Sequence, residues 1–121
     1  MSKDNSISAC HEDEFSWIRC EGKGSFLNSP LLKDWSEREI KNGATCIVVD
    51  LQACKGMDST FMGTMAGLAM RLMKLPEGKL HVAEPGERNR KSLEDLGLDV
   101  IMDIDPADGC WRGKITEIRA K

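Results

Sequence analysis

The chain has 121 residues, of which 40% are hydrophobic and 31% charged, and this composition suits one folded domain rather than two. Seventeen basic and 20 acidic side chains give a net charge of −3, so nucleic acid is not an expected partner. The longest weakly charged stretch, residues 56–70, is shorter than the roughly 20 apolar residues of a membrane span. We expect no membrane insertion, and because the N-terminus is acidic where a secretion signal is apolar, we expect a cytoplasmic protein.

The pattern along the chain predicts alternating strands and helices. Residues 1–13 are polar and lack periodicity, which predicts a flexible N-terminal arm or a short first strand ahead of a domain spanning residues 14–121. Apolar alternation and β-branched runs predict four strands, at Phe15–Cys20, Thr45–Leu51, Lys79–Ala83 and Val100–Ile104. Helical spacing and boundary signals predict three helices, at Pro30–Lys41, Ser59–Leu75 and Pro85–Leu96. The segment from Gln52 to Asp58 is expected to be a loop, and the tail around Ile115 and Ile118 a single helical turn or an edge strand.

Helices that follow short apolar strands favour parallel neighbours, because parallel strands need crossover connections. The sequence therefore predicts an α/β fold, with one mixed or mainly parallel sheet covered by helices in a single domain. The first helix is expected to face the sheet with its four large apolar side chains, Leu31, Leu32, Trp35 and Ile40. In the second helix, Met65 and Met73 are predicted to be core residues, and Met62 a possible contact.

The five cysteines, Cys10, Cys20, Cys46, Cys54 and Cys110, form no CxxC pair, and only two histidines could join them. A structural zinc site takes its ligands in close pairs, so we expect no metal. Reduced thiols are the simplest interpretation, with Cys46 as a small core residue. An enzymatic alternative is a thiol-dependent activity at Cys10 or Cys54, which would need a lowered thiol pKa.

The four residues Met57, Asp58, Ser59 and Thr60 lie where a loop meets the start of the second helix. The first amide groups of a helix lack intrahelical partners and carry a partial positive charge, so they attract anions such as a phosphate carried by a nearby hydroxyl. A carboxylate one residue away would repel that phosphate, and phosphorylation should then change the local surface strongly. The structural alternative is that an aspartate or serine here only caps the helix.

A resemblance covers most of the chain. The chain contains, in this order, IVVDLQACKGMDST, an apolar helix, KLHVAEP and SLEDLGLDVIMDID. This order resembles that of the STAS domain and, within it, that of the anti-sigma-factor antagonists. The family motif Asp-Ser-Ser/Thr-Gly corresponds to Asp58, Ser59, Thr60 and Phe61, with phenylalanine in place of glycine. The resemblance implies phosphorylation at Ser59, with Thr60 as the weaker candidate.

What the resemblance implies about function is a partner switch. The unphosphorylated protein would bind an anti-sigma factor that is also a serine kinase, phosphorylation would release it, and a phosphatase would reset the protein. The chain would then be a binding module with no cofactor and no enzymatic activity of its own. Partner contacts are expected at Asp58, Ser59, Thr60, Phe61, Met62 and, in the turn before the first helix, Asn28. The alternative is a STAS subunit that is not phosphorylated and that serves a lipid-transport ATPase or a signalling scaffold.

Overall fold

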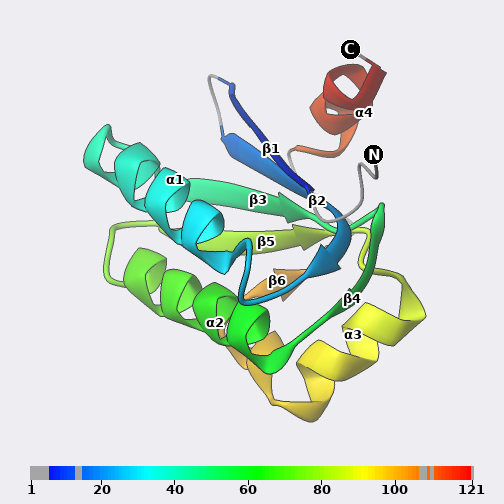
Figure 1. The fold of residues 1–121 in the computed structure, drawn as a ribbon. Coiled ribbons are helices and arrows are strands. Elements are labelled where there is room, and N and C mark those ends of the chain that lie inside the picture. Colours follow the sequence, from blue (N-terminus) through cyan, green and yellow to red (C-terminus); the bar gives the residue numbers. More distant parts are fainter. Residues whose placement is uncertain (1–5, 13–14, 107–108, 110, 121) are drawn as a thin grey trace.

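The structure is a computed structural model that describes residues 6–12, 15–106, 109 and 111–120. Within these ranges the chain forms one domain with a six-stranded sheet and four α-helices (Figure 1). The strands are β1 (Ser6–His11), β2 (Ser16–Gly24), β3 (Cys46–Asp50), β4 (Cys54–Met57), β5 (Lys79–Ala83) and β6 (Asp103–Ile104). The helices are α1 (Ser29–Lys41), α2 (Ser59–Met73), α3 (Gly86–Asp95) and α4 (Arg112–Ala120), with a short 3-10 helix, η1 (Leu98–Val100), after α3.

The sheet is mixed. Its strands follow the order β1-β2-β3-β5-β6, and β4 pairs with the far end of β2. Strand β1 is antiparallel to β2, whereas all other described pairings are parallel. Parallel pairing requires crossovers, and α1, α2 and α3 provide them between successive strands. The predicted fold class, a mixed sheet covered by helices in a single α/β domain, is confirmed.

Alternating side chains of the central strands build two cores. On one face, Ile47 and Val49 of β3 join buried side chains of α1 and α2, which lie side by side over the sheet (Figure 1). On the other face, Val48 and Trp17 pack against Trp111, Ile115 and Ile118 of the C-terminal segment. Helices therefore cover both faces, and the start of α2 lies beside the end of β2.

The structure corrects several predicted elements. The expected loop contains strand β4, because Cys54–Met57 pairs with β2. Of the expected strand over residues 100–104, only Asp103–Ile104 is a strand, and Val100 ends η1. Helix α4 is longer than the single turn expected for the tail. At the N-terminus, Ser6–His11 forms β1, so the short strand and not the flexible arm describes these residues; residues 1–5 and 13–14 lie outside the described ranges.

The faces of two helices also differ from expectation. Helix α1 buries Ser29, Leu32, Ser36 and Ile40, while Leu31 is 58% exposed. In α2, Met65 is buried as predicted, but Met73 is 52% exposed. The sheet-facing stripe of α1 contains two serines, so the large apolar residues alone did not define it. Leu31 is therefore an exposed apolar side chain in the first turn of α1, whereas Met73 lies at the opposite end of α2 from Ser59.

Candidate functional site

Asp58 joins three segments at the start of α2. It follows β4 directly, and its backbone N–H donates to the carbonyl of Gly24 at the end of β2 (2.9 Å). One carboxylate oxygen accepts the Phe61 N–H (2.8 Å), which caps the helix, and the other accepts the Phe26 N–H (2.9 Å) from the turn before α1. Asp58 therefore holds the β2–α1 turn against the N-terminus of α2.

These hydrogen bonds favour the ionised carboxylate. The pKa of Asp58 is lowered below its ordinary value of 3.8, most of all by the hydrogen bond from the Phe61 N–H. The hydrogen bond from the Phe26 N–H and the positive charge of Lys23 lower it further. A carboxyl group whose pKa is lower in the folded than in the unfolded chain stabilises the fold at pH values above its unfolded-state pKa. That contribution is lost as the pH falls through the folded pKa.

We expect Asp58→Ala to lower the melting temperature at pH 7, and the gap to wild type to narrow as the pH falls below 3.8. Thermal unfolding of both proteins from about pH 7 to about pH 2 measures this gap. Asp58→Asn is the matched control, since it retains an acceptor oxygen that does not titrate and should stay closer to wild type at neutral pH. A gap between Asp58→Ala and wild type that stays constant to the lowest pH would contradict the role given to the carboxylate.

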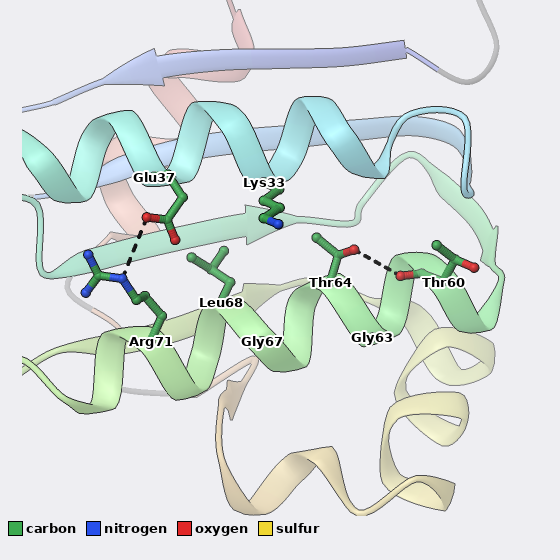
Figure 2. A pocket seen from close by; sticks show the side chains of 8 residues that line it. All are labelled: Lys33, Glu37, Thr60, Gly63, Thr64, Gly67, Leu68 and Arg71. Carbon is green, nitrogen blue, oxygen red and sulfur yellow. Dashed lines mark hydrogen bonds and ion pairs between the residues drawn. The ribbon is translucent and has the colours of Figure 1, made fainter.

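Ser59 and Thr60 are both exposed at the start of α2. Ser59 is the first residue of the helix, and its hydroxyl makes no hydrogen bond with any residue that the structure describes. The Thr60 carbonyl accepts a hydrogen bond (3.1 Å) from the hydroxyl of Thr64, one turn further along α2 (Figure 2). Both hydroxyls predicted to accept a phosphoryl group are therefore accessible to another protein, and Asp58 lies next to them.

The other three residues predicted as partner contacts are buried. Phe61 is completely enclosed, and a Cβ added to Gly24 would lie 2.7 Å from its ring. Met62 is 8% exposed. Asn28 is 4% exposed, and its amide accepts from the Ser25 N–H (2.8 Å) and donates to the Lys23 carbonyl (3.0 Å). Phe61, Met62 and Asn28 thus shape the site from below and do not form its outer surface.

Sequence reasoning missed the exposed apolar residues beside the site. Phe26 and Leu27 in the turn before α1 are 63% and 72% exposed, and Leu31 lies one helical turn after Leu27. We call these three residues the apolar rim. A turn that carries two large apolar side chains at once, in the sequence Gly24-Ser25-Phe26-Leu27, was the available signal, because turns more often carry small or polar residues.

A groove with a volume of about 420 Å³ runs between α1 and α2, from Thr60 at the start of α2 to Arg71 in its last turn. We call it the α1–α2 groove. Its lining residues are Lys33, Glu37, Thr60, Gly63, Thr64, Gly67, Leu68 and Arg71 (Figure 2). Because Thr60 belongs to both, the groove is continuous with the start of α2.

The thiol alternative gains little from its surroundings. A hydrogen bond between the two thiols lowers the pKa of Cys54 to about 7 and raises that of Cys20, but both side chains are buried in the core and line no part of the α1–α2 groove. The Cys10 sulfur lies 3.4 Å from a Glu12 carboxylate oxygen, and Cys10 also lines no part of the α1–α2 groove. Cys46 is only partly buried, and Cys110 lies outside the described residues.

We also searched the described part of the chain for metal-binding clusters, membrane-spanning helices and contacts of the histidines. Its histidines, cysteines and carboxylates form no cluster of three that could hold a metal ion. No helix in the described ranges has the length and apolar character needed to cross a bilayer. The His11 ring lies 2.7 Å from a Glu39 carboxylate oxygen, which ties β1 to α1.

The family model for the STAS domain matches residues 6–108, and the chain belongs to this family. No curated protein matches the sequence significantly. Solved structures resemble it at low identity, which supports the fold alone. A Thermotoga maritima protein proposed as an anti-sigma factor antagonist has a TM-score of 0.75 at 19% identity, over 93% of this chain and 94% of that one.

Two further antagonists share the fold. An anti-sigma factor antagonist from Mycobacterium paratuberculosis has a TM-score of 0.71 at 20% identity, over 98% of this chain and 99% of that one. The antagonist SpoIIAA in its unphosphorylated form has a TM-score of 0.72 at 21% identity, over 96% and 98%. The phosphorylated form of SpoIIAA, from Bacillus, has a TM-score of 0.67 at 20% identity, over 96% and 100%.

Proposed function

We propose that this protein is an anti-sigma factor antagonist that acts as a phosphorylatable partner switch. In its unphosphorylated form it binds an anti-sigma factor that is also a serine kinase, and phosphorylation of Ser59 releases that partner. The observation that carries the proposal is the Ser59 hydroxyl, exposed and without a hydrogen-bond partner among the described residues, at the first position of α2. A relative that exists in unphosphorylated and phosphorylated forms supports the same chemistry.

The charge change is large for so small a site. A serine hydroxyl is neutral, whereas a phosphoryl group adds close to two negative charges at neutral pH. The Asp58 carboxylate already lies next to Ser59, and its two oxygens accept the amide groups of Phe61 and Phe26. A partner surface that fits the unphosphorylated site would meet three negative charges after modification, which costs binding free energy unless that surface is strongly cationic.

In this scheme the chain is a substrate and a binding module. The kinase partner transfers the γ-phosphoryl group of ATP to the Ser59 oxygen and releases ADP, and a protein phosphatase later hydrolyses the phosphoserine. The chain itself contributes position and surface, without a cofactor. We place this exchange in the cytoplasm, where ATP and sigma factors are found.

The proposal is tested by incubating the protein with a cognate anti-sigma factor kinase and ATP and locating the modified peptide by mass spectrometry. We expect one phosphoryl group on wild type and on Thr60→Ala, and none on Ser59→Ala. Because Thr60 is the neighbouring exposed hydroxyl, Thr60→Ala is the matched control. Phosphorylation that persists in Ser59→Ala would contradict the assignment. Stable binding of a transport ATPase that Ser59→Glu leaves unchanged would favour the alternative of a STAS subunit without phosphorylation.

A further inference from the structure

A second cavity opens on the face of the sheet that α1 and α2 do not cover. It has a volume of about 440 Å³ and lies between β1, β2 and the last turn of α4. Trp17 packs in the core beneath α4, and alternate side chains of a strand share a face, so Arg19 and Glu21 point to the same side of the sheet. Both line the cavity, as does Ser8 of β1, which lies opposite Arg19 in the strand register.

The buried Asp50 carboxylate contacts three of the side chains that line the cavity, and its acceptor positions are fully used. One oxygen accepts the Gln52 N–H (3.0 Å) and Arg119 Nη2 (2.6 Å). The other accepts Arg119 Nε (2.8 Å) and the Trp17 indole N–H (3.1 Å). A carboxylate offers about four lone-pair positions, so these four hydrogen bonds leave none for Arg19, whose Nη1 stays 3.6 Å from the nearer oxygen.

Arg19 therefore retains most of its hydrogen-bonding capacity. A guanidinium has five N–H donors, and among the described residues that of Arg19 makes one hydrogen bond, from Nη1 to Gln52 Oε1 (3.3 Å). Its second carboxylate neighbour, Glu21, lies 3.9 Å from Nε and is 44% exposed. A long ion pair with so much solvent around it contributes little free energy. The Arg19 side chain itself is only 19% exposed, so bulk water has limited access to its remaining donors.

Apolar side chains form another part of the cavity wall. Trp17 of β2 and Ile118 of α4 are nearly buried in the core beneath α4, and both also line the cavity, beside Cys10 of β1. Small-molecule sites combine such a wall with a few polar groups that fix the orientation of the ligand, in volumes of about 300–1,000 Å³. A guanidinium fits a carboxylate through two parallel hydrogen bonds, which a point charge does not provide.

We propose that this cavity binds a small organic carboxylate, whose apolar or aromatic body lies against Trp17 and Ile118 and whose carboxylate accepts two hydrogen bonds from Arg19. The ligand replaces Glu21 as the neighbour of the guanidinium. An inorganic anion would satisfy Arg19 but leave the apolar wall uncovered, and a neutral ligand would cover the wall without satisfying the charge. Because the lining residues come from β1, β2 and α4, the bound ligand would stabilise the docking of α4 on the sheet. This inference does not depend on the proposed function.

The probes are β-naphthylacetate, its neutral analogue β-naphthylacetamide and inorganic phosphate, each titrated into the intact nitrogen-15-labelled protein and followed by amide chemical shifts. We expect β-naphthylacetate to shift the signals of Ser8, Arg19 and Ile118 with a dissociation constant of about 1 mM or lower. The amide and phosphate should each bind about tenfold more weakly or worse. Absence of saturable shifts at these three residues, or an amide or phosphate that binds as tightly as the carboxylate, would overturn the inference.

Variants of the lining residues test the assigned contacts. Arg19→Gln should weaken binding of β-naphthylacetate by about tenfold or more, whereas Glu21→Gln, which removes the competing carboxylate, should tighten it by about threefold. Ser8→Tyr fills the cavity from an exposed position of β1 and should also abolish binding. Its matched control is Ala9→Tyr at the next exposed residue, which faces the other side of the strand, does not line the cavity and should bind within about twofold of wild type. Folded Ser8→Tyr that binds as well as Ala9→Tyr, or Glu21→Gln that binds more weakly than wild type, would contradict the site.

Discussion

Replacing Phe61 by alanine should lower the free energy of unfolding by about 3–5 kcal/mol. The ring is completely buried and so close to the backbone of Gly24 that a single added carbon there would overlap it. Truncation leaves a cavity between α2 and the end of β2 that this backbone contact can close only in part. Urea unfolding followed by circular dichroism measures the change, and an effect below about 1 kcal/mol would mean that the ring does not pack as described.

The matched control for Phe61 lies on the same helix. Met70 is 57% exposed, and Met70→Ala should change the free energy of unfolding by no more than about 0.5 kcal/mol. The contrast matters for function because the family motif has glycine where this chain has Phe61. A large loss at Phe61 and none at Met70 identifies the phenylalanine as a support for the start of α2.

Asp50→Ala should destabilise the protein by about 3–5 kcal/mol. Asp50 is fully buried at the end of β3 and accepts three hydrogen bonds from long side chains: from Arg119 Nε (2.8 Å), from Arg119 Nη2 (2.6 Å) and from the Trp17 indole (3.1 Å). Removing the carboxylate leaves the Arg119 guanidinium, which is only 14% exposed, without its main anion. Arg119 keeps its ion pair with Glu84 in this variant, whereas Arg19, whose Nη1 lies 3.6 Å from the Asp50 carboxylate, also loses that neighbour.

One further variant at Asp50 separates charge from packing, and a surface aspartate serves as the control. Asp50→Asn keeps an acceptor oxygen and the size of the side chain, so its loss should be smaller than that of Asp50→Ala. Asp99→Ala removes an exposed carboxylate and should have an effect within about 0.5 kcal/mol. Equal free energies of unfolding for Asp50→Ala and Asp99→Ala, measured by urea unfolding, would show that the buried pair does not hold α4 on the sheet.

Local sequence patterns predicted the central strands and the three crossover helices because these elements contain long periodic or β-branched runs. Strand β4 was missed since Cys54–Met57 contains a lysine and a glycine, and pairing with the end of β2 defines it more than its own side chains do. Strand β6 is only two residues long and forms beside β5. Short strands of this kind depend on neighbours that are distant in sequence.

The site was predictable in part. The position of Ser59 at a helix start and the capping role of Asp58 follow from local chemistry, and the structure has both. The depth of Phe61 and Asn28 does not follow, because it depends on how α2 packs on β2 and how the turn before α1 folds back. The exposure of Leu31 was hidden for a related reason, since buried Ser29 and Ser36 occupy the sheet-facing stripe that larger residues were expected to fill.

The most direct measurement compares the affinity of the anti-sigma factor for two forms of this chain, one with serine and one with phosphoserine installed at position 59 during synthesis. We expect the unmodified protein to bind and the phosphoserine form to bind about tenfold more weakly or worse, since the added charge stands beside Asp58 at the start of α2. Equal dissociation constants for the two forms would contradict a switch at Ser59.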